Sequence, residues 1–107
     1  MQVTVTGKHL GITTPIREYA QQKADKLPRY YDRITAIEVL ASRLEHGQHE
    51  VEVIVHVEHA DPVIAHASDH DLYASIDQTM DKLERQLTDL KERTRNHKYR
   101  VQNEKAG

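Results

Sequence analysis

Cysteine, phenylalanine and tryptophan are all absent from this chain of 107 residues. Without cysteine the chain has no disulfides, no thiolate chemistry and no cysteine-based zinc site. No apolar run approaches the roughly 18 residues that cross a bilayer, so we expect no contact with a membrane. The first residues, MQVTVTGKHL, lack a positive start followed by an apolar stretch, so we expect no secretory signal. These absences favour a soluble cytoplasmic protein.

Glycine is also scarce, and its placement argues against an enzyme. The four glycines form neither a GxGxxG nor a GxxxxGK loop, so the sequence offers no cradle for a nucleotide phosphate. Paired carboxylates such as Asp77 and Asp81 fall on an exposed helix flank rather than in a pocket that could shift their pKa values. We therefore expect a binding module that has no catalytic residue and needs no cofactor.

What is present is regular alternation and regular helical stripes within a single domain. Alternating apolar and polar residues predict strands at residues 2–6, 34–44, 50–58 and 63–68. The order β-α-β-β-β-α predicts an α+β fold with a four-stranded, mostly antiparallel sheet and two helices packed on one of its faces. The opposite face then carries Glu38, Glu52 and Glu58.

Two helices are predicted between these strands and after them. Thr14 is placed as the N-cap of the first helix with Pro15 at its first position, and Pro28 as its stop. Asp69 or Asp71 is placed as the cap of the second helix. The inner stripes consist of Ile16, Ala20, Ala24 and Leu27 in the first helix, and of Leu72, Tyr73, Ile76, Met80, Leu83, Leu87 and Leu90 in the second. Periodicity is lost from about Asn96, so we expect a domain at 1–95 and a flexible basic tail at 96–107.

Both helices separate their charges by sign when residues are placed about 100° apart around the axis. On the second helix Lys82, Arg85 and Arg93 fall on one flank, with Asp77, Asp81 and Glu84 on the other. On the first helix Tyr19, Lys23 and Lys26 lie opposite Glu18 and Asp25. A helix that needed only solubility could mix its signs, so this sorting predicts a surface for a negatively charged partner.

The net charge of −2 hides a strongly basic end. Between Lys91 and Lys105 six basic residues stand against two glutamates, a surplus of four, so the rest of the chain carries −6. Such a chain can bind phosphate through one face while the remainder is repelled. None of the five tyrosines lies in a predicted strand, which excludes a sheet that stacks single-stranded bases.

Tyrosines and histidines have further possible roles. Tyr73 is predicted to be buried, and Tyr19, Tyr30 and Tyr31 to be more exposed. A zinc site is weighed at His56 and His66, as cross-strand neighbours with Glu58 nearby, but no ordered ligand spacing accompanies them, so we expect surface histidines and no metal.

Three segments resemble one known family. They are YYDRI at Tyr30–Ile34, HEVEVIVHV at His49–Val57 and DLYASIDQTMDKLERQL at Asp71–Leu87. These segments resemble the ribosome hibernation promoting factors and the related ribosome-associated inhibitor, over Met1 to about His97. The short basic end and the lack of a following domain resemble the short-form promoting factor. The hairpin ASRLEHGQHE holds only Arg43 as a basic residue, so we expect no contact from it.

The resemblance implies a fold similar to double-stranded-RNA-binding domains with an added first strand. It also implies binding to the small ribosomal subunit and its rRNA, in the channel for messenger RNA and transfer RNA, where it blocks translation in starved or stationary-phase cells. A small ribosome modulation factor is an expected partner in pairing ribosomes, and we expect a monomer off the ribosome. Together with the basic flank, the resemblance gives as candidate rRNA-binding residues Lys23, Lys26, Arg33, Lys82, Arg85, Lys91 and Arg93. The alternatives are a protein-interaction module using the sheet edge or Leu40 and Ile54, and a structured-RNA-binding domain that does not act on ribosomes.

Overall fold

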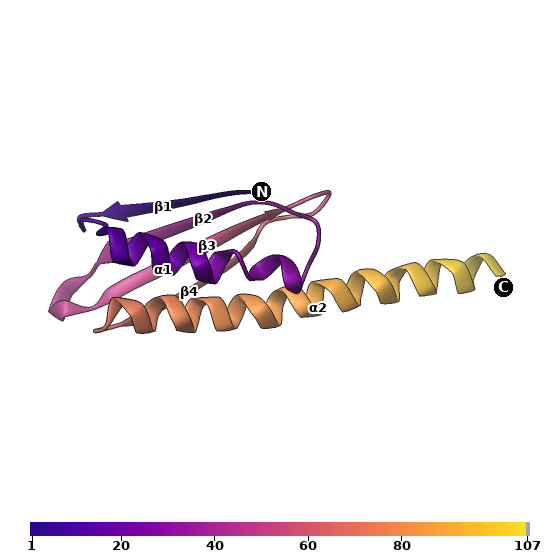
Figure 1. Cartoon of the computed structure of the whole chain (residues 1–107). Helices are drawn as coiled ribbons and strands as arrows, with labels where there is room; N and C mark the ends of the chain where they lie inside the picture. The colour runs from indigo at the N-terminus through magenta and orange to yellow at the C-terminus, as the bar shows by residue number, and fades with distance from the viewer. Residues whose placement is uncertain (107) are drawn as a thin grey trace.

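The strands form one four-stranded sheet in the order β1-β2-β3-β4 (Figure 1). The computed structural model describes the backbone of residues 1–106 and the side chains of residues 1–95. β1 runs parallel to β2, whereas β2–β3 and β3–β4 are antiparallel. The predicted α+β fold with a mostly antiparallel sheet is therefore confirmed. The strand bounds are β1 Gln2–Lys8, β2 Ile34–Arg43, β3 His49–Val57 and β4 Val63–Asp69.

Helix α1, Thr14–Ala24, makes the crossover that a parallel β1–β2 pair requires. Its N-cap is Thr13 rather than the expected Thr14, and the Thr13 Oγ1 accepts a hydrogen bond from the Ile16 amide at 3.4 Å. The helix ends at Ala24, before the expected stop at Pro28, and Pro28 lies inside a short 3-10 helix, Leu27–Arg29. The predicted inner stripe of α1 is buried as expected.

Helix α2, Leu72–Ala106, begins at the cap residue Asp71, whose Oδ1 accepts from the Tyr73 amide at 3.0 Å. The helix continues past the end that we expected near Asn96 and projects beyond the sheet (Figure 1). Losing the apolar stripe removes packing partners but not helical propensity, and no proline or glycine occurs between Asn96 and Ala106. The side chains of 96–107 lie outside the described residues, so a flexible basic tail stays a prediction.

Both helices cover the same face of the sheet and enclose the core (Figure 1). Two hydroxyls tie α2 to β3 within this core. The Ser75 Oγ donates to the His49 carbonyl at 2.7 Å, and the fully buried Thr79 Oγ1 lies 3.2 Å from the Val51 carbonyl and 2.7 Å from the Ser75 carbonyl. Every polar group of this pair is thereby satisfied, which fixes where α2 sits along the sheet. Within residues 1–106, no helix has both the length and the apolar character needed to span a membrane.

Candidate nucleic-acid interface

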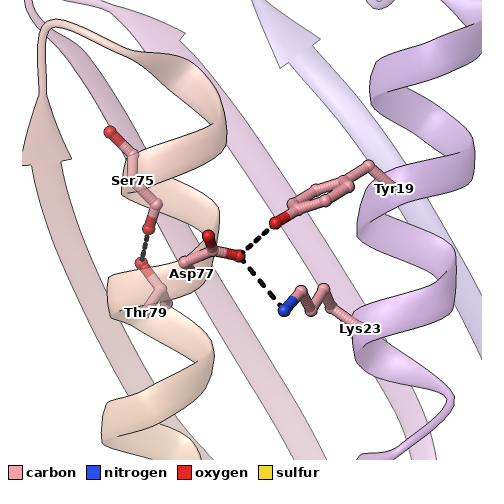
Figure 2. A network of polar contacts seen from close by, with 5 residues as sticks. All are labelled: Tyr19, Lys23, Ser75, Asp77 and Thr79. Atoms are coloured by element: carbon pink, nitrogen blue, oxygen red, sulfur yellow. Dashed lines mark hydrogen bonds and ion pairs between the residues drawn. The ribbon is translucent and has the colours of Figure 1, made fainter.

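A polar seam joins α1 to α2, and Asp77 lies at its centre (Figure 2). The Asp77 Oδ1 accepts a hydrogen bond from the Tyr19 hydroxyl at 2.6 Å and lies 3.4 Å from the Lys23 Nζ. The Lys23 Nζ is also 5.4 Å from the centre of the Tyr19 ring. Tyr73 packs edge-on against that ring, with the ring centres 4.9 Å apart and the planes at 82°. We call Tyr19, Lys23, Tyr73 and Asp77 the interhelix seam.

The interhelix seam favours the protonated forms of Tyr19 and Lys23. The hydrogen bond to Asp77 is the largest cause that raises the pKa of Tyr19, and partial burial adds to it. Partial burial lowers the pKa of Lys23, but hydrogen bonding and attraction to Asp77 together outweigh it, so the pKa of Lys23 is raised overall. Lys23 therefore carries its charge across the whole physiological pH range, and carries it beside a carboxylate.

This geometry gives part of the charge sorting an intramolecular explanation. The acidic flank of α2 faces the flank of α1 that carries Tyr19 and Lys23. Farther along the same flank, the Glu84 carboxylate is the main cause that raises the pKa of the Tyr30 hydroxyl. Helical periodicity assigned the charged residues to the correct flank of each helix. It did not show that Lys23 faces Asp77 and is therefore only partly exposed.

The basic flank of α2 lies on the other side of the helix, toward β4. The Lys82 Nζ donates to the His66 carbonyl at 2.7 Å, and Lys82 remains exposed. Arg85 is exposed on the same turn of the helix. Arg93 lines a surface hollow that the acidic residues Asp61, Asp89 and Glu92 also line. Lys82 and Arg85 are thus the residues of this flank that can most readily meet a phosphate.

A second group of basic residues lies in the connection between α1 and β2. Lys26 and Arg33, both predicted, are exposed there, and so is Arg29 in the 3-10 turn between them. We did not single out Arg29 from the sequence, although its position directly after Pro28, in a turn, was a signal for exposure. Lys91 is exposed on α2, about two turns beyond Glu84.

The tyrosine predictions are partly wrong. Tyr73 is 39% exposed, because it packs on the Tyr19 ring at the helix surface instead of in the core. Tyr31 is buried, at 6% exposure, whereas Tyr19 and Tyr30 are partly buried. Helical spacing placed Tyr73 at the margin of the stripe, and a margin position is buried only if a neighbouring element covers it.

The histidine pair considered for zinc is not formed. In the register of β3 and β4, His66 lies opposite Glu52 and Ile54 lies opposite Ile64, so His56 and His66 are not cross-strand neighbours. The His56 Nε2 lies instead 2.6 Å from the Glu38 Oε2, across β2 and β3. Among the side chains of residues 1–95, no group of three or more histidine and carboxylate residues could hold a metal ion.

Comparisons with known proteins agree with one another. Residues 3–95 match the Ribosomal S30AE family, described as sigma 54 modulation protein / S30EA ribosomal protein. The chain is 40% identical to a ribosome hibernation promoting factor of Azotobacter vinelandii over 93 residues, which are 87% of this chain and 85% of that protein. It is 37% identical to the protein of that name from Escherichia coli K12 over 97 residues, 91% of this chain and all of that protein.

Solved structures show the same fold. The N-terminal domain of Thermus thermophilus Protein Y matches with a TM-score of 0.75 and 32% identity, covering 84% of this chain and 99% of that one. A ribosomal subunit interface protein from Coxiella burnetii matches with a TM-score of 0.74 and 28% identity, covering 85% and 98%. The resemblance noted in the three sequence segments is confirmed, and the chain belongs to the S30AE family that contains the ribosome hibernation promoting factors.

Proposed function

We propose that this chain is a cytoplasmic ribosome hibernation factor that binds rRNA of the small subunit through its helix layer. Membership of the S30AE family supports a role in hibernation. The observation that carries the proposal is the position of Lys82 and Arg85. Both are exposed, and they lie on the flank of α2 opposite the one that carries Asp77. Lysine and arginine at such a flank neutralise phosphates and release counterions, with little reading of bases.

The mechanism is occlusion without a chemical step. The chain occupies the channel for messenger RNA and transfer RNA, and the occupied subunit cannot initiate translation. Lys26 and Arg33, exposed in the connection between α1 and β2, and Lys91, exposed on the side of α2 away from Lys82, supply a second group of phosphate contacts. Lys82 exchanges its hydrogen bond with the His66 carbonyl for a phosphate oxygen, an exchange between exposed groups that costs little. With a small modulation factor present, we propose that the chain supports ribosome dimers.

The test is binding to purified small subunits at several salt concentrations, followed by sedimentation. Replacing Lys82 and Arg85 by glutamate should lower the salt slope by about two, since each lost phosphate contact lowers it by about one. The matched control reverses Lys8 and Arg43, which are also exposed but lie at the ends of β1 and β2 and not on a helix. Circular dichroism checks the fold of both variants.

Three outcomes decide the proposal. Weakened binding by the α2 variant alone, with translation in a bacterial extract inhibited in proportion to occupancy by the unchanged chain, supports it. Equal weakening by both variants shows that net charge alone matters. Unchanged binding by the α2 variant shows that this flank is only a solvated surface.

A further inference from the structure

Both helices lie on one face of the sheet, and no other described element covers the opposite face (Figure 1). The strand registers place three apolar residues on that open face. Ile54 and Ile64 lie directly opposite each other across β3 and β4, and Ile64 is 49% exposed. Leu40 lies diagonally next to Ile54, because Leu40 pairs with Glu52 and Glu38 pairs with Ile54. These three residues lie on the face away from the helices, so they do not contribute to the core. Apolar residues are unusual at such positions, because solvated faces of antiparallel sheets normally carry polar side chains.

Carboxylates border this apolar group. Glu38 lies between Thr4 and Ile54 in one row of the sheet, and Glu52 lies between Leu40 and His66 in the next. No lysine or arginine occupies an outward position on β2, β3 or β4, and the one outward lysine in the described sheet is Lys8, at the end of the edge strand β1. We call Glu38, Leu40, Glu52, Ile54 and Ile64 the open-face patch.

His56 holds one of these carboxylates in place. The His56 Nε2 lies 2.6 Å from the Glu38 Oε2, and since a carboxylate only accepts, the imidazole donates this hydrogen bond. The Glu38 side chain nevertheless stays 43% exposed. The hydrogen bond therefore holds the Glu38 carboxylate at the His56 side of the open-face patch, and acceptor capacity is left for a partner.

We infer that the open-face patch binds a basic polypeptide segment of another protein, which places lysine or arginine against Glu38 and Glu52 and an apolar side chain between Ile54 and Ile64. Charge complementarity selects this occupant. A nucleic acid or an anionic lipid surface would meet carboxylates, and the strands offer no aromatic ring for stacking bases. A second copy of this face would place carboxylate against carboxylate. The inference does not depend on rRNA binding, because the helix layer lies on the opposite side of the sheet.

The test is a titration of the full chain, followed by backbone amide resonances, with a short synthetic peptide that alternates lysine with valine. A peptide with glutamate in place of lysine is the parallel probe. We expect the lysine peptide alone to shift resonances, concentrated at residues 36–42, 50–56 and 64–68, and the binding to weaken as salt rises. Replacing both Glu38 and Glu52 by lysine should weaken binding about tenfold or more.

The control replaces Glu18 and Glu45 by lysine, which changes the net charge equally at exposed positions away from the patch. It should weaken binding less than twofold. Replacing Ile64 by serine removes apolar contact without changing charge and should also weaken binding. Shifts confined to the acidic flank of α2, equal binding of both peptides, or equal weakening by both double variants would overturn the inference. So would a concentration-dependent dimer that Ile64→Ser abolishes, or the same shifts on addition of an RNA oligonucleotide.

Discussion

Replacing Asp77 by asparagine should strengthen binding to the small subunit, because it releases Lys23. In the structure the Lys23 Nζ lies 3.4 Å from Asp77 Oδ1, and both side chains are partly exposed. Asparagine keeps an acceptor for the Tyr19 hydroxyl but removes the charge that holds Lys23. One more lysine free to meet a phosphate raises the salt slope by about 0.7 to 0.9, which near 0.15 M salt is about four- to sixfold in affinity.

Stability should change little in this variant. The ion pair is exposed by more than a third on each side, and exposed pairs contribute at most about 1 kcal/mol. The melting temperature should therefore fall by only a few degrees. The assay is equilibrium binding to purified small subunits between low and high salt, together with thermal unfolding.

Asp81→Asn supplies the matched control. Asp81 is exposed on the same flank, and in the part of the chain with described side chains it forms no ion pair. The Asp81→Asn substitution changes the net charge by the same amount without releasing Lys23, so its effect on the salt slope of binding should be small. If both variants strengthen binding equally, the release of Lys23 is not the cause. If Asp77→Asn weakens binding, Lys23 is needed in its present place and the reasoning is wrong.

Three further predictions concern the core, the seam and the tail. Thr79→Val should lower the melting temperature by about 5 to 10 °C, because it removes a buried hydroxyl with two carbonyl neighbours. The control Thr88→Val removes a similar hydrogen bond on an exposed turn and should change the melting temperature little. Equal effects of the two variants would contradict a stabilising role for the buried Thr79 hydroxyl. Raised pKa values of Tyr19 and Lys23 mean that the protonated forms stabilise the fold, so this stability is present below about pH 10 and is lost as the pH rises through the folded pKa values. Tyr19→Phe should therefore flatten the fall of melting temperature measured between neutral and strongly alkaline pH, and an unchanged profile would refute it. A version ending at Asn96 should keep its melting temperature but bind ribosomes less tightly and give fewer dimers with a modulation factor on sucrose gradients; dimers abolished by the full chain and restored by truncation would show the opposite role for the tail.

The strands and the inner helix stripes were predictable because each repeats at the period of its own element. Val51, Val53 and Val55 occupy every second position of their strand and are buried, and Ile76, Leu83 and Leu87 recur at helical steps and are buried. The family resemblance rests on the same short segments. Such patterns report on one element at a time, so they need no knowledge of its neighbours.

Positions at the edges of elements were predicted less well. The N-cap falls on Thr13 rather than Thr14, since either threonine could cap and only the path from β1 selects one. Tyr73 lies at the margin of its stripe, where exposure depends on how closely α1 approaches. The end of α2 was placed too early, because a helix can continue on propensity after its packing surface ends.

The sequence by itself determined which residues of each helix share a flank and which sheet residues share a face, because backbone periodicity alone fixes both. Only the tertiary structure decided what each flank meets. It set the acidic flank of α2 against Lys23 of α1, turned Lys82 toward β4, and placed Ile54 beside Ile64 and away from any helix. Those pairings depend on the order of the strands and on the face that the helices cover, and both are settled by packing the whole core at once.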